Sequence, residues 1–209
     1  MIELYAITDE RAPRLPPIAP LSAVASHGLA AVYAPADAEL QVSPEALWQH
    51  ERVVEALMED RDLLPVRFGT RLEDEAAAAR SLEERHQEFA GALARVRGAV
   101  EVSVRVLGET PRPQPSESLS GAEYLRARAR SESAAEAVST AIHEPLSSRA
   151  RACAKLSAPD PAELLRAAYL VDRDELSAFV ACVEELDEAN PGLSVLCTGP
   201  WPPYSFSAP

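Results

Sequence analysis

Apolar residues recur along the chain with two different periods, which predict alternating strands and helices. The clearest strand runs from Val100 to Val106, where valines alternate with Glu101, Ser103 and Arg105. Alternation with a period of two is typical of a strand with one buried face. Further strands are predicted at 2–7, 29–33, 63–68, 149–156, 164–171 and 193–197. The segment 164–171 also suits a helix, because its Ala and Leu residues fit either period.

Helices are predicted where apolar positions lie three and four residues apart. Ser43 is a natural N-cap and Pro44 suits the first helical position, so a helix is expected from there to about Met58. Asp172 with Glu175 predicts a capping box at the start of the last helix. Two longer helices are predicted at about 73–96 and 121–146.

The order of these elements predicts an α+β protein with two small domains. Residues 108–118 contain three prolines, so we expect a proline-rich linker there, between a domain at 1–107 and another at 119–209. Helices inserted singly between strands favour a ferredoxin-like (split βαβ) sheet for the first domain. For the second we expect a related α+β sandwich with a long leading helix and a tail rich in aromatic residues and proline.

Charge and composition narrow the function classes. The chain has 33 acidic and 20 basic residues and a formal net charge of −13, which repels phosphate backbones, so no nucleic-acid partner is expected. No apolar run approaches the roughly 20 residues of a membrane span, and the first residues lack the features of a signal peptide. The three cysteines are odd in number and widely spaced, as in reduced proteins. We therefore expect a cytoplasmic protein with no membrane partner.

The motifs of common catalytic and metal sites are missing. His50-Glu51 begins like a zinc-protease motif, but Val54 stands where the second histidine is required. The four histidines are far apart, and we expect them to be surface or half-buried polar residues rather than metal ligands. Glycine-rich phosphate loops and a nucleophile elbow are also absent. The sequence predicts no catalytic residue, no cofactor and no metal.

Two segments are unusual enough to be candidate binding sites. Residues 64–71 place Arg67 and Arg71 around a strand end and a glycine turn, where Arg67 could cap helix carbonyls, pair with an acid such as Glu51, or bind a partner. The closing segment 199–206 holds three aromatic side chains on a proline-stiffened backbone: Trp201, Tyr204 and Phe206. Such a tail either packs onto the last domain or presents its aromatic rings to a partner.

Several stretches, taken in order, form a signature: Leu47–Met58 continued by Leu64–Thr70, then Gly121–Leu125, Tyr169–Asp172 and Thr198–Phe206. Together they resemble the GvpF/GvpL family of gas vesicle proteins over nearly the whole chain, and the closing motif is the most specific. The resemblance implies two α+β domains, the first ferredoxin-like, and an accessory role in gas vesicle formation. It also implies partners, namely the small hydrophobic shell protein and other accessory proteins, and it supplies no catalytic residues.

Three hypotheses about function follow. The first is a non-enzymatic assembly factor, located in the cytoplasm and at the gas vesicle, that binds the shell protein and nucleates or chaperones its polymerisation. The second is a regulatory module that holds a small molecule between ferredoxin-like sheets, and the third is an enzyme of undetected type. For the first hypothesis the candidate partner-binding residues are Trp48, Arg67, Arg71, Trp201, Tyr204 and Phe206.

Overall fold

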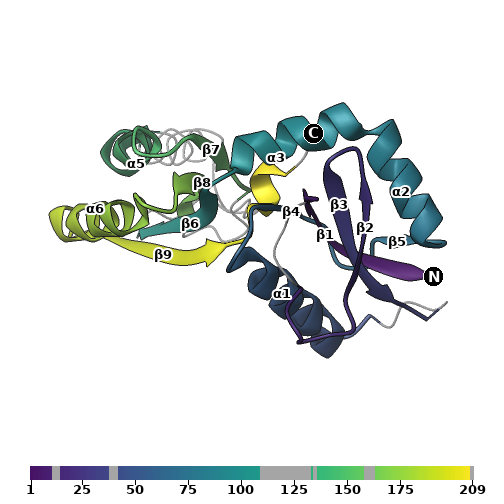
Figure 1. Cartoon of the computed structure of the whole chain (residues 1–209). Coiled ribbons are helices and arrows are strands. Elements are labelled where there is room, and N and C mark those ends of the chain that lie inside the picture. Colours follow the sequence, from purple (N-terminus) through teal and green to yellow (C-terminus); the bar gives the residue numbers. More distant parts are fainter. Residues whose placement is uncertain (11–14, 38–41, 109–132, 134–135, 158–162, 208–209) are drawn as a thin grey trace, which may run out of the picture. The chain divides into compact units, whose positions relative to one another are not determined.

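The chain forms two compact units, each built on one antiparallel sheet (Figure 1). The structure, a computed structural model, describes residues 1–10, 15–37, 42–108, 133, 136–157 and 163–207. The first unit comprises Met1–Val100 together with Trp201–Pro209, and the second comprises Glu101–Pro200. The α+β class predicted from the sequence is therefore confirmed.

The two units divide the chain at points other than those expected. Strand β6 (Ala99–Gly108) was assigned to a domain ending at residue 107, but it belongs to the second sheet. Its alternating valines supply the reason, because they are buried in the core of the second unit. The tail from Trp201 was expected in the domain 119–209, and it belongs to the first unit. Apart from Gly108, the expected linker at 108–118 lies outside the described residues.

The first sheet has the strand order β2-β3-β1-β4, with β5 also paired to β1. Its strands are β1 (Ile2–Asp9), β2 (Ser22–Ser26), β3 (Leu29–Pro35), β4 (Leu63–Pro65) and β5 (Arg71–Leu72). Because β3 is antiparallel to both β1 and β2, these two strands run parallel with β3 between them. This is the split arrangement of a ferredoxin-like sheet. The connection from β1 to β2 contains no helix in its described part, residues 15–21.

Helices cover both faces of the first sheet. Figure 1 shows α1 (Pro44–Met58) on one side and α2 (Glu75–Glu84) with α3 (His86–Val96) on the other. Every residue of β1 except Asp9 is consequently buried, a pattern typical of a strand covered on two faces rather than one. The helix expected over 73–96 is thus two helices, which meet at Arg85 with φ −110° and ψ 21°.

The second sheet has the order β7-β8-β6-β9. Its other strands are β7 (Ala152–Lys155), β8 (Glu163–Asp172) and β9 (Leu193–Trp201). A π-helix (Ser139–His143) and α5 (Glu144–Ser147) lie between β6 and β7, and α6 (Leu176–Ala189) lies between β8 and β9. Among the described residues this succession of elements is βαββαβ, which is consistent with a ferredoxin-like order. The long helix expected from 121 lies largely outside the described residues.

The last helix begins later than expected. Glu175 occupies the N-cap position of α6 and makes no side-chain cap hydrogen bond. The carboxylate of Asp172 forms an ion pair with Arg151 instead. The predicted capping box was therefore wrong, although the apolar stripe that follows does face the core, with Phe179, Cys182 and Val183 buried.

A buried histidine–tyrosine pair lies in the core of the second unit. Nδ1 of His143 lies 2.7 Å from the hydroxyl of Tyr169, whose ring packs against Phe179 at 5.4 Å between centroids. Burial lowers the pKa of His143, nearby Lys155 lowers it further, and Glu144 opposes the shift. Burial also raises the pKa of Tyr169. The hydrogen bond therefore joins a neutral imidazole to a neutral phenol.

We expect the free energy of unfolding to fall as the pH drops through about 6.5, the ordinary pKa of histidine. The folded-state pKa of His143 lies below its unfolded value, so unfolding takes up a proton. The stabilisation is complete above the unfolded pKa and is lost as the pH falls toward the folded one. Chemical denaturation of the full chain across this range should show a shallower pH dependence for His143→Gln. If the free energy of unfolding depended on pH equally in the wild type and in His143→Gln, His143 would not be the group that takes up the proton.

Candidate functional site

The structure brings all six candidate residues into the first unit. They lie on α1, in the turn that follows β4, on β5 and in the tail, and they are Trp48, Arg67, Arg71, Trp201, Tyr204 and Phe206. Their environments differ, because Trp48 and Arg67 are exposed whereas Arg71, Tyr204 and Phe206 are half-buried. The candidates therefore divide into side chains that a partner could contact directly and side chains that hold the local structure.

Helix α1 separates an apolar buried face from an exposed aromatic one. It begins as the sequence predicts, since the Ser43 hydroxyl accepts a hydrogen bond from the backbone nitrogen of Ala46 at 3.1 Å. The buried residues lie on one side: His50, Val53, Val54, Leu57 and Met58. On the outward side, Trp48 is 69% exposed and Leu47 is 46% exposed. Large apolar side chains exposed together on a helix are typical of surfaces that bind another protein.

The imidazole of His50 lies beneath this exposed face and is only 1% exposed. Its Nε2 is 2.8 Å from the carbonyl oxygen of Val66, and its Nδ1 is 3.1 Å from Oε1 of Glu3. The ring stacks on Tyr5 at 4.7 Å between centroids and meets the edge of Phe68 at 5.6 Å. One side chain thus joins α1 to the first strand and to the segment after β4.

The contact with Val66 fixes the role of one ring nitrogen. A carbonyl oxygen only accepts, so Nε2 donates its hydrogen to Val66. On the other side of the ring, Nδ1 and the Glu3 carboxyl lie within hydrogen-bond distance.

The same glutamate reaches the second candidate segment. Its Oε2 lies 3.6 Å from Nη2 of Arg71, whose Nη1 donates to the backbone oxygen of Asp37 at 2.9 Å. Arg71 is therefore a structural residue that links β5 to the buried pair. Within the turn, Thr70 donates to the carbonyl of Arg67 from both its backbone nitrogen and its hydroxyl.

The turn presents Arg67 to solvent. Gly69 has φ of +80°, a left-handed conformation that glycine adopts without strain. The pairing of Arg67 with Glu51 that the sequence allowed does not form, and Glu51 instead accepts a hydrogen bond from the Tyr204 hydroxyl at 3.2 Å. Arg67 is exposed on a turn whose backbone is held by hydrogen bonds at both ends.

The tail packs onto the first unit rather than the last. The 3-10 helix Tyr204–Phe206 contacts α3, and the Tyr204 hydroxyl bonds to Glu51 of α1. Burial raises the pKa of Tyr204, and the charges of Glu51 and Glu55 raise it further. Trp201 keeps 41% of its surface exposed. The closing segment is thus mainly structural, with one aromatic ring partly available.

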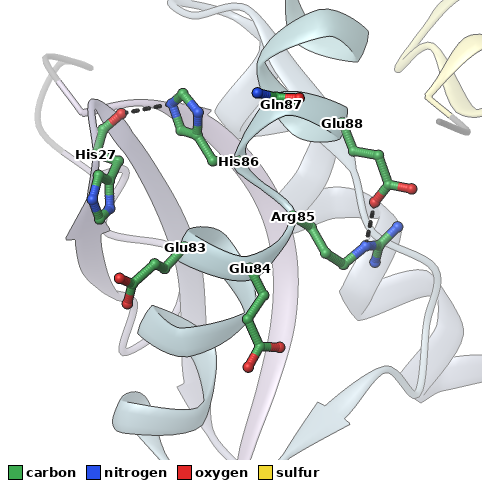
Figure 2. Close-up of a pocket in the computed structure, with 7 residues that line it drawn as sticks. All are labelled: His27, Glu83, Glu84, Arg85, His86, Gln87 and Glu88. Carbon is green, nitrogen blue, oxygen red and sulfur yellow. Dashed lines mark hydrogen bonds and ion pairs between the residues drawn. The ribbon is translucent and has the colours of Figure 1, made fainter.

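A hollow of about 760 Å³, which the sequence did not reveal, lies at the junction of α2 and α3. Figure 2 shows the side chains that line it. His86 Nε2 lies 3.0 Å from the carbonyl of His27, and Arg85 pairs with Glu88 at 2.5 Å. Glu83 and Glu84 point in different directions (Figure 2). Across the described residues, no group of three or more His, Cys, Asp or Glu side chains is placed to hold a metal. No helix in that part of the chain could cross a membrane.

Sequence reasoning missed the central residue of this region. Histidines were expected on the surface or half-buried, yet His50 and His143 are both buried. A signal was present, because Val53, Val54 and Leu57 follow His50 at spacings of three, four and seven, the positions of one helix face. Its partner Glu3 lies 47 residues away, and no local pattern indicates such a pairing.

Fold and site together define a two-unit α+β protein with an exposed aromatic helix face supported by a buried polar network. A sequence model of the family described as gas vesicle synthesis protein GvpL/GvpF matches residues 4–208. The chain belongs to this family. It is a family of gas vesicle proteins, not a known enzyme family, and membership supports a role in gas vesicle formation.

Individual relatives agree with this assignment. Gas vesicle protein L of Streptomyces sp. (strain CB03234) is 35% identical, covering 78% of this chain and 69% of that protein. Gas vesicle protein F of the same strain is 28% identical, with 97% and 98% covered. Crystal structures of GvpF from Anabaena sp. PCC7120 and Microcystis aeruginosa superpose with TM-scores of 0.85 and 0.77 over the whole chain. Their identities of 19% and 18% show the shared fold.

We expect His50→Leu to lower the free energy of unfolding by about 1–3 kcal/mol, because the buried Glu3 carboxyl loses the imidazole and keeps the more distant Arg71. The carbonyl of Val66 also loses its donor. His50→Gln, which keeps an amide donor, should cost less, and Glu3→Gln combined with His50→Leu should cost less than the two single losses added together. Denaturant unfolding of the wild type, the three single variants and the double variant measures these free energies. Additive losses would contradict a coupled pair.

Proposed function

We propose that this chain is a non-enzymatic accessory protein of gas vesicle assembly that binds the hydrophobic shell protein through its first unit. The observation that carries the proposal is the exposed face of α1, where Trp48 and Leu47 project from a helix fixed by the buried His50. Family membership supports the gas vesicle context. The cytoplasm, where shell subunits await assembly, is the compartment that the proposal requires.

The physical task suits an acidic protein with a local apolar surface. A shell subunit must be strongly apolar where it faces gas, so free subunits would aggregate. An exposed tryptophan supplies a large rigid contact for such a surface. The net charge of −13 keeps the resulting complexes apart in solution. Covering and then releasing the apolar surface is how this chain would chaperone or nucleate polymerisation.

The remaining candidates have supporting roles in this proposal. Arg67 offers a cation on a fixed turn to acidic groups at the rim of the contact, and Trp201 offers part of its ring. Arg71, Tyr204 and Phe206 hold the turn and the tail in place. A metabolite-binding module, the alternative function, would need polar groups that converge on one point, and those around the hollow at α2 and α3 do not (Figure 2).

We expect Trp48→Ala to weaken capture of shell protein by roughly 30-fold, the effect of losing about 2 kcal/mol at an aromatic anchor. Because Trp48 is exposed, the free energy of unfolding should change by no more than about 0.5 kcal/mol. Leu156→Ala is the matched control, since it removes an exposed apolar side chain from the second unit. Titration of immobilised full-length protein with shell protein measures the change. A folded Trp48→Ala variant with wild-type affinity would refute this contact.

A further inference from the structure

Strand β2 lies at the edge of the first sheet, and no other described strand pairs with its outer side. The strand order places β2 at the end of the sheet, paired only with β3. Edges in natural proteins are commonly blunted by charged side chains, proline or a bulge. Residues Ser22–Ser26 contain no charged residue and no proline, although the chain carries a net charge of −13. Their register with β3 is regular, without a bulge.

The turn that joins β2 to β3 determines which backbone groups face outward. His27 and Gly28 have φ of 53° and 83°, the two positive values of a type I′ hairpin turn. In such a turn the flanking residues, Ser26 and Leu29, form a hydrogen-bonded pair. Hydrogen bonding alternates along an antiparallel ladder, so Val24 and Ser22 also bond toward β3. Ala23 and Ala25 therefore direct their backbone N–H and C=O groups to the open edge, and no described residue pairs with them there.

The sequence of strand β2 is a palindrome. Ser22-Ala23-Val24-Ala25-Ser26 reads the same in both directions. An antiparallel partner with the same sequence, related by a twofold axis at Val24, places Ala23 opposite Ala25 of the second copy. Both residues have outward-facing backbone groups, so each of the two equivalent pairs exchanges two hydrogen bonds. The turn determines which residues of β2 direct their hydrogen-bonding groups outward, and the palindrome has its centre at Val24. Both features place the twofold axis at Val24.

The side chains are compatible with this pairing. Val24 is half-buried and Ala23 and Ala25 are exposed, so the two faces of β2 differ. At the axis the two valines form a non-hydrogen-bonded pair, in which the side chains approach most closely. A β-branched apolar pair at this position favours association, and the absence of charge avoids repulsion. We propose that β2 is a self-association surface, through which a second copy of this chain extends the first sheet.

This inference is independent of the shell-protein contact, because it uses β2 rather than α1. Such a short interface is expected to be weak in isolation. If both proposals hold, a dimer carries two Trp48 faces and binds a polymer of shell subunits bivalently, which raises its avidity without new contacts.

Disulfide cross-linking between two copies tests the position of the proposed twofold axis. In a Cys153→Ser background, which removes the exposed native thiol, Val24→Cys should form a covalent dimer under mild oxidation. Its Cα atoms would be about 4.5 Å apart across the axis, within disulfide range. Ala23→Cys is the matched control, because two Ala23 positions are diagonal neighbours about 7–8 Å apart. We expect Val24→Cys to cross-link at least about tenfold faster, since pairs beyond about 7 Å require backbone movement.

A double variant keeps the test decisive. Ala23→Cys combined with Ala25→Cys should cross-link where neither single change does, because these positions face each other in the proposed register. Thermal unfolding of each reduced variant confirms that it is folded. Equal rates for Val24→Cys and Ala23→Cys, or no covalent dimer from Val24→Cys and from the double variant, would overturn the proposal. Neither result would bear on shell-protein capture by Trp48.

Discussion

The buried imidazole of His50 is the constraint on which the first unit depends. It donates to the backbone of Val66 and contacts the carboxyl of Glu3, so one side chain joins a helix, the central strand and the turn that follows β4. Both polar partners are largely buried, and removing the imidazole would leave the Val66 carbonyl without this donor and the Glu3 carboxyl with the more distant Arg71. The position of α1 on the sheet follows from this network. The exposure of Trp48 on the opposite side of the same helix follows in turn.

Several helix and strand positions could be predicted from the sequence, because the patterns that indicate them span only a few neighbouring residues. The start of α1 at Ser43 and Pro44 is confirmed, as are strands at the valine run of β6 and at β8. Period and capping chemistry act over a few residues, so they appear directly in the sequence. Strand β2 was missed because it is short and follows a proline-rich stretch. The break at Arg85 was missed because neither proline nor glycine marks it.

The long-range features could not be predicted from the sequence. β6 has the alternation of a strand wherever it pairs, and only the sheet order shows that it belongs to the second unit. The tail likewise belongs to the first unit, through contacts such as Tyr204 with Glu51 across 153 residues. The two sheets share one strand order, β2-β3-β1-β4 and β7-β8-β6-β9, although no internal repeat is evident in the sequence. The exposed Trp48 and Leu47 of α1 make the first unit the candidate for binding.

We propose that the first unit contacts shell protein through the outward face of α1 and the neighbouring turn. Hydrogen exchange of the full chain, with and without shell protein, tests this directly because it reports every segment at once. The account predicts added protection at the start of α1 around Trp48 and in the turn at 67–70, with the second unit unchanged. Protection confined to residues 101–200, with α1 and the turn unaffected, would contradict it.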